Sequence, residues 1–169
     1  YMARVAPAVD AVGDRAKWEF YAGDGKWAQG DVSRAQPLLS WANRTGVTTM
    51  TYIPAVKRYI MCISTPTHSP FTMKEFDTYF LESESITGPF RYISYMRKFG
   101  PESYFVNIPS KFVGAAVDED GSITLFLSYS ANFAFKKQPA SPPGSGYHWV
   151  LQEVKFKLRE AAKPHQAFV

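Results

Sequence analysis

The sequence has little cysteine, little helical periodicity and no long apolar run. Its 169 residues include one cysteine, Cys62, so no disulfide can form within the chain. This cysteine lies in the apolar segment Tyr59–Ile63, where a thiol is expected to be buried and inert. No apolar run approaches the ~18 residues that a membrane helix needs, so we expect no membrane partner. The cysteine usage leaves the cellular compartment open.

Several motifs for common chemistries are also missing. The three histidines, His68, His148 and His165, lack the spacing of metal ligands, and we expect no metal site. There is no Gly-x-Ser-x-Gly elbow, phosphate loop or dinucleotide fingerprint, and we therefore expect no cofactor. The acidic run Asp118–Gly121 lacks the rest of a calcium loop, and its Asp-Gly ending predicts a hairpin turn.

The composition is that of an ordinary globular chain. Hydrophobic residues make up 46% and charged residues 20%, at a length sufficient for a real core. Half of the net charge of +4 lies in the last stretch of the chain, and the rest is interspersed and forms no dense basic stripe, so a nucleic-acid partner is not expected. Aromatic residues reach 16%, which suits both strands and ligand-stacking surfaces.

Most of the chain follows strand-like patterns rich in β-branched and aromatic residues. Helical signal is thin, with a turn or two predicted in Val9–Arg15 and in Ser33–Trp41. The segment Pro54–Val56 is predicted as a short turn. The predicted strands are Thr48–Ile53, Lys57–Thr65, Phe76–Ser83, Phe90–Met96, Tyr104–Ile108, Ser110–Val117, Ser122–Ser130 and Tyr147–Leu158.

A strand–turn–strand unit occurs more than once. The clearest copy runs from Phe76 to Tyr95, and Tyr1–Val5 with Lys17–Gly23 reads as the end of an earlier copy. Sets of about four strands with a period of ~40–50 residues are typical of a β-propeller. We therefore expect an all-β chain with a partial β-propeller domain over residues 1–160 and a C-terminal tail over 161–169. A β-sandwich is the alternative.

Three segments carry a family resemblance: Trp18–Gly23, Thr51–Ile60, and Glu82 through Gly88-Pro89-Phe90. They resemble a group of five-bladed β-propellers related to arabinanase-type and levansucrase-type glycoside hydrolases. The chain would match about 2.5 C-terminal blades of such a propeller. The resemblance implies a carbohydrate ligand, a secreted or extracytoplasmic location, and a companion N-terminal chain or homo-oligomer. It also implies that the catalytic acids lie partly or wholly outside this chain.

Glycoside hydrolysis needs two carboxyl groups across the scissile bond. Asp77 and Glu82 are the catalytic candidates, with Glu19 and Glu84 as further acids; the alternative is that Glu82 and Glu84 lie in solvent at a strand end. The substrate-binding candidates come from predicted inner strands and the segments after them: Thr49, Tyr52, Ser110, Lys111, Tyr129 and Asn132. Ordinary surface exposure is the alternative for Lys111, and core packing is the alternative for Tyr129.

Two functional hypotheses follow. The first is a segment of a carbohydrate-active propeller that is a glycoside hydrolase when complete. The second is a sugar-binding or protein-binding propeller without catalysis, favoured by the lack of an evident acid pair. Asn43-Arg44-Thr45 is a glycosylation sequon, which would matter in a secreted eukaryotic protein.

Overall fold

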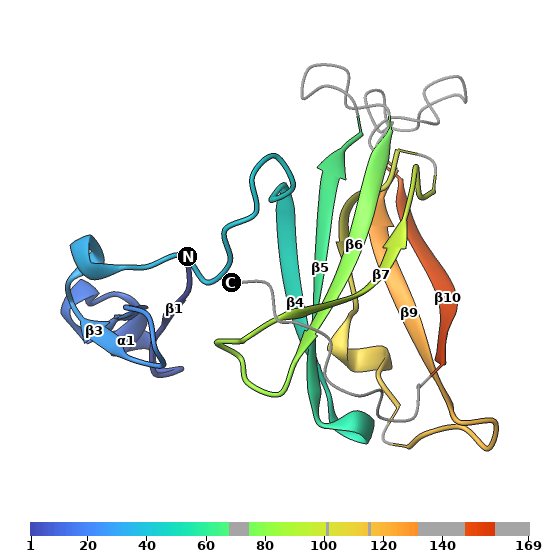
Figure 1. The fold of residues 1–169 in the computed structure, drawn as a ribbon. Helices are drawn as coiled ribbons and strands as arrows, with labels where there is room; N and C mark the ends of the chain where they lie inside the picture. The colour runs from blue at the N-terminus through green and yellow to red at the C-terminus, as the bar shows by residue number, and fades with distance from the viewer. Residues whose placement is uncertain (68–74, 101, 115, 132–147, 158–169) are drawn as a thin grey trace. The chain divides into compact units, whose positions relative to one another are not determined.

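The computed structural model describes residues 1–67, 75–100, 102–114, 116–131 and 148–157 (Figure 1). The chain divides into two compact units, Tyr1–Trp41 and Ala42–Val169. The strands within the described residues form three antiparallel sheets of three, four and three strands. No helix in these described ranges is long and apolar enough to cross a membrane.

The first unit holds a small sheet, here called sheet A, with the strand order β1-β2-β3. Ala3 pairs with Phe20 and Arg4 pairs with Glu19, which confirms the predicted pairing of these two segments. The helical turns have simple local causes, because Asp14 and Asp31 each accept a backbone hydrogen bond from two residues ahead. Its elements are β1 (Ala3–Arg4), α1 (Val9–Val12), η1 (Arg15–Lys17), β2 (Glu19–Tyr21), β3 (Trp27–Gln29) and η2 (Val32–Arg34).

The second unit begins with a four-stranded meander, here called sheet B, in the order β4-β5-β6-β7. The four predicted strands are confirmed with shifts of one residue at some ends. The predicted turn is a single 3-10 turn, closed by Lys57 in the left-handed conformation at φ +52°. The elements are β4 (Val47–Ile53), η3 (Pro54–Val56), β5 (Arg58–Pro66), β6 (Phe76–Ser83) and β7 (Arg91–Met96).

A three-stranded meander, sheet C, follows in the order β8-β9-β10. The predicted strand Ser110–Val117 is wrong, because Ser110–Phe112 forms a 3-10 turn in which the Phe112 amide donates to the Pro109 carbonyl. Asp118–Gly121 forms a turn as predicted, with Gly121 at φ +74°, but it is not a hairpin between two strands, because a 3-10 turn stands where the preceding strand was expected. The elements are β8 (Tyr104–Asn107), η4 (Ser110–Phe112), β9 (Ser122–Ser130) and β10 (Trp149–Lys157).

Sheets B and C share one apolar core. Alternate residues of β5 and β9 point into it, as the two-residue period of a strand requires. The first strands of the two sheets are also joined by side chains, since Thr49 Oγ1 and Thr51 Oγ1 donate to the backbone carbonyls of Val106 and Ile108. The core consists of Ile53, Ile60, Cys62, Phe80, Val106, Ile108, Ile123, Leu125, Leu127 and Tyr129.

The all-β class is therefore confirmed. No propeller is detected within the part of the chain that the structure describes. Two antiparallel sheets over one core are compatible with a sandwich and with two neighbouring blades. In both arrangements the sheets are held by apolar burial and by the threonine hydrogen bonds between β4 and β8.

Candidate functional site

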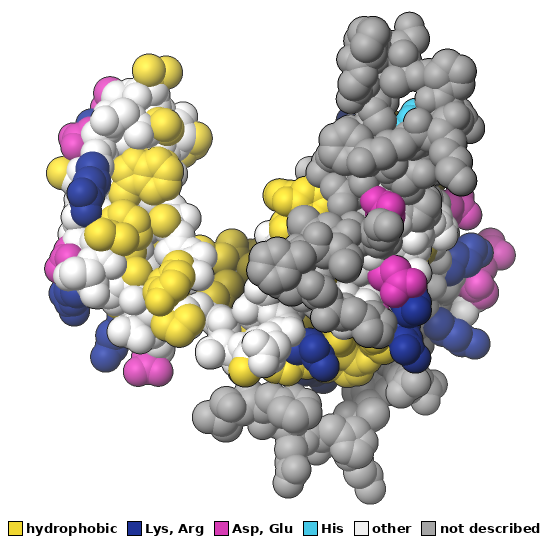
Figure 2. All heavy atoms as spheres, turned by 90° about the horizontal axis from the view of Figure 1, so that it is seen from above, with side chains coloured by type: hydrophobic (Ala, Val, Ile, Leu, Met, Phe, Trp, Pro, Cys, Tyr) yellow, Lys and Arg dark blue, Asp and Glu magenta, His cyan; other side chains and the backbone are white. Residues whose placement is uncertain are grey.

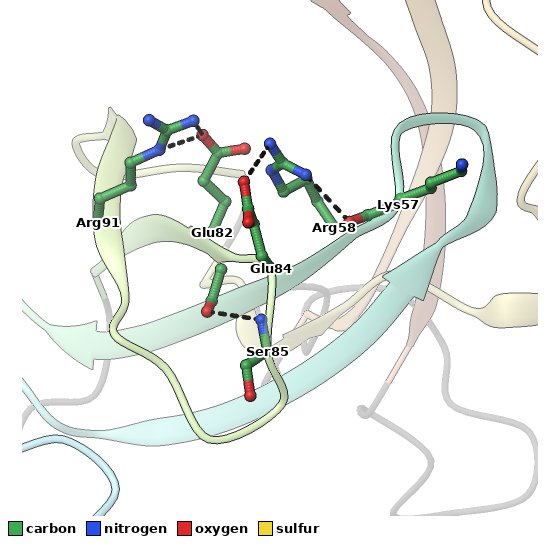
Figure 3. Close-up of polar contacts among 7 residues, drawn as sticks. Lys57, Arg58, Glu82, Glu84, Ser85 and Arg91 are labelled. Carbon is green, nitrogen blue, oxygen red and sulfur yellow. Dashed lines mark hydrogen bonds and ion pairs between the residues drawn. The ribbon is translucent and has the colours of Figure 1, made fainter. Parts of the chain in front are cut away.

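Glu82 lies near the end of β6 and forms a cross-strand ion pair. It is directly opposite Arg91 of β7, whose Nε and Nη2 atoms lie 2.6 and 2.5 Å from Glu82 Oε1 (Figure 3). Only 18% of the Glu82 side chain is exposed. The carboxylate therefore ties β6 to β7 at this end of sheet B.

The neighbouring acid, Glu84, is engaged in the same way. Arg58 Nη2 lies 2.8 Å from Glu84 Oε1, and Arg58 also donates to the backbone carbonyl of Lys57 (Figure 3). The Glu84 side chain is largely exposed, and exposed pairs of this kind contribute about 0–1 kcal/mol. The end of β6 is thus an ion-pair cluster of alternating charge.

Asp77 lies at the opposite end of β6 and is only 7% exposed. Its carboxylate accepts hydrogen bonds from Thr67 Oγ1 at 3.0 Å, from the Tyr95 hydroxyl at 2.9 Å and from the Lys98 amide at 3.0 Å. Burial by itself raises the pKa of this carboxyl, but the three hydrogen bonds outweigh burial and hold the pKa below its ordinary value. Asp77 is therefore an ionised anchor that joins the ends of β5, β6 and β7.

The structure does not bring Asp77 and Glu82 together. They are five residues apart on β6, so they point to opposite faces of sheet B. At about 3.3 Å per residue, their backbones are ~16 Å apart. Carboxyl pairs of glycosidases are about 5–5.5 Å apart in retaining enzymes and about 6.5–9.5 Å apart in inverting enzymes. The geometry of β6 thus gives this pair no shared site.

The expected substrate-binding residues are scattered over unit 2. Thr49 is held by its hydrogen bond to the Val106 carbonyl, at 2.8 Å. Tyr52 is exposed at 43%, and its ring lies 4.9 Å from that of Tyr59. Ser110 and Lys111 belong to the exposed turn η4, where Lys111 Nζ lies 5.9 Å from the centre of the Phe112 ring.

The remaining two substrate-binding candidates are Tyr129 and Asn132. Tyr129 is buried in the core with its ring 5.4 Å from that of Phe99, and burial raises its pKa. It therefore takes the core-packing role that was the alternative for it. Asn132 lies outside the described residues.

Cys62 is completely buried in the core between the sheets, as expected. Burial raises the pKa of its thiol to about 12 despite a hydrogen bond with Thr49. A thiol with this pKa is not a nucleophile near neutral pH. Within the described ranges, no group of three or more His, Cys, Asp or Glu side chains could hold a metal ion.

Aromatic side chains are exposed at several places that the sequence did not single out. They lie on strands β7, β8 and β10 and on the turn η4 of unit 2, and the residues are Tyr92, Tyr95, Phe105, Phe112 and Trp149. Aromatic enrichment was visible in the sequence, but which rings stay at the surface depends on how the strands pack. No local pattern could have identified them.

Unit 1 carries an apolar surface of its own (Figure 2). Two hollows, with volumes of about 300 and 470 Å³, share Phe20 and Val32 in their linings. Nearby, the Arg4 guanidinium lies 4.0 Å from the centre of the Trp27 ring and pairs with Glu19 at 2.8 Å. Of the acids considered from the sequence, Glu19 is therefore occupied by a salt bridge as well.

Comparison of the chain with protein-family models, with curated proteins and with solved structures found no match.

Proposed function

We propose that sheets B and C are neighbouring blades of a larger, carbohydrate-active β-propeller. Each sheet is a meander whose spatial order follows the chain. The first strands of the two meanders, β4 and β8, lie side by side and are joined by the hydrogen bonds of Thr49 and Thr51. Adjacent first strands are what blades around a common axis require. This arrangement supports the five-bladed resemblance over the sandwich alternative.

In this proposal the chain contributes glycan binding and not the acid pair of hydrolysis. The observation that carries it is the exposure of aromatic rings on both sheets, among them Tyr52, Phe105 and Trp149. Aromatic faces pack against the apolar faces of sugar rings, and ligand sites are commonly lined by aromatic side chains. The acids Asp77, Glu82 and Glu84 are each engaged in holding strands together.

If the complete protein is a glycoside hydrolase, its catalytic carboxyls belong to other blades. Those blades would come from a companion N-terminal chain or from a second copy of this chain. A secreted or extracytoplasmic location, where polysaccharides are found, goes with this proposal.

Isothermal titration of the purified protein with soluble arabinan and levan tests the proposal. A reducing-sugar assay on the same samples measures cleavage. We expect saturable binding without turnover by this chain. A folded sample that binds neither glycan contradicts the proposed function, and turnover by this chain alone contradicts the absence of an acid pair.

A further inference from the structure

Phe105 on β8 combines a strained backbone with an exposed ring. Its φ is +64°, in the left-handed region that a bulky side chain rarely adopts, and 51% of the residue is exposed. Glycine or asparagine would adopt this conformation at lower cost. The ring packs edge-on against the Tyr104 ring, with the ring centres 5.9 Å apart. Neither the local conformation nor full burial accounts for a phenylalanine at this position.

The strain coincides with a break in the β8–β9 ladder. Tyr104 pairs with Ser130, and Asn107 pairs with Ser128. Between these two pairs β8 advances by three residues and β9 by two, so β8 carries one extra residue, a β-bulge. Such bulges redirect side chains and are frequent beside binding sites. Strained residues that persist in a fold are likewise concentrated at functional sites.

A second exposed aromatic residue lies in the row of sheet C that contains Tyr104, the neighbour of Phe105. Trp149, the first residue of β10, is 68% exposed and pairs with Ser130, which pairs in turn with Tyr104. Two strand spacings separate β8 from β10, so the backbones of this row span about 10 Å. Phe105 and Trp149 therefore lie at the same end of the sheet, a short oligosaccharide length apart.

The strand residues around this row are uncharged. Neither β8 (Tyr104–Asn107) nor the first half of β10 (Trp149–Gln152) contains a lysine, arginine, aspartate or glutamate. The final residues of β9, Ser128–Ser130, are neutral and include two hydroxyl side chains of serine. A nucleic acid would require cations for its phosphates. Aromatic rings with neutral polar groups instead match an uncharged glycan.

We propose that Phe105 and Trp149 are two stacking platforms for a neutral glycan chain that crosses the end of sheet C. This inference rests on the proposed glycan binding and assigns its contact residues. The backbone strain at Phe105 is retained because it holds the ring at the surface, where the ring meets the ligand.

The test uses the full chain with arabinan and levan as probes, in titration calorimetry and thermal unfolding. The variants are Phe105→Gly, Phe105→Tyr and Trp149→Ala, and the matched control is Tyr1→Ala, an exposed aromatic residue of unit 1. We expect Phe105→Gly to bind at least tenfold more weakly while unfolding at the same or a higher temperature, because glycine relieves the strain. Trp149→Ala should also lose tenfold or more, whereas Phe105→Tyr and Tyr1→Ala should bind as the unchanged protein does.

The outcomes separate the two proposals. If the unchanged protein binds neither glycan, the proposed function fails and this inference fails with it. If the unchanged protein binds and Phe105→Gly binds equally well, only this inference is overturned. A marked loss of thermal stability in Phe105→Gly would assign the ring to packing and would also overturn it.

Discussion

The Tyr95 hydroxyl donates a hydrogen bond of 2.9 Å to Asp77 Oδ2. This bond joins the end of β7 to the start of β6 across the outer face of sheet B. Burial, together with the hydrogen bond and the charge of the carboxylate, raises the pKa of Tyr95 to about 12. The tyrosine thus stays a donor at all moderate pH values, and the carboxylate that it serves stays ionised.

The first prediction concerns the pH dependence of stability at Asp77. Its pKa is lowered in the folded state, so its contribution is fully present above the unfolded pKa and is lost as pH falls through the folded pKa. Asp77→Asn should therefore reduce the free energy of unfolding by about 1–3 kcal/mol at pH 7. The difference from the unchanged protein should shrink as the pH falls below about 4.

Urea unfolding over a pH series measures this effect. Glu84→Gln is the matched control, because it makes the same change from acid to amide at an exposed ion pair. The control should change the free energy of unfolding by less than about 1 kcal/mol. Equal stability of Asp77→Asn and the unchanged protein at pH 7 would refute the anchoring role.

The second prediction concerns the link between sheets B and C. Thr51→Val keeps the shape of the side chain and removes the hydroxyl that donates to the Ile108 carbonyl at 2.6 Å. We expect a loss of about 1–2 kcal/mol in the free energy of unfolding, because a buried carbonyl loses its partner. Thr48→Val, at an exposed position of the same strand, is the control and should be nearly neutral. A neutral Thr51→Val would show that apolar packing alone joins the two sheets.

The third prediction concerns the reactivity of Cys62. Its thiol is buried and its pKa is raised to about 12, so a thiol-specific disulfide reagent should not label the native protein at pH 8. In concentrated urea the same reagent should label one thiol per chain, the number that the sequence contains. Rapid labelling without denaturant would mean that the core between sheets B and C opens readily.

The fourth prediction concerns Glu82 as a catalytic candidate. Glu82→Gln removes the charge that pairs with Arg91, and we expect glycan affinity to stay within twofold of the unchanged protein. Its stability should fall by about 1–3 kcal/mol, because a largely buried carboxylate loses its charge opposite Arg91. The assays are titration with arabinan and levan and a reducing-sugar measurement of any cleavage by the complete protein. If cleavage is present and Glu82→Gln abolishes it in a folded sample, the catalytic expectation is restored.

The sequence was sufficient for the elements whose signals are local. Alternation and β-branched residues predicted β4, β5, β6 and β9 closely, because a strand with a buried face has a two-residue period. The pairing of β1 with β2 was also predicted correctly. The error at Ser110–Val117 arose because an apolar segment after Pro109 reads as a strand, whereas its backbone closes a 3-10 turn.

The role of each polar residue was decided by tertiary structure. Asp77 and Glu82 looked alike in the sequence, yet one is buried under three hydrogen bonds and the other pairs with an arginine on the next strand. These partners depend on strand register, which no local pattern contains. Exposure of Phe105 and Trp149 depends in the same way on a bulge and on the packing of sheet C. The sequence by itself determined an all-β chain, because strand periodicity is local; only the packing of its sheets decided which side chains anchor the fold and which remain available to a ligand.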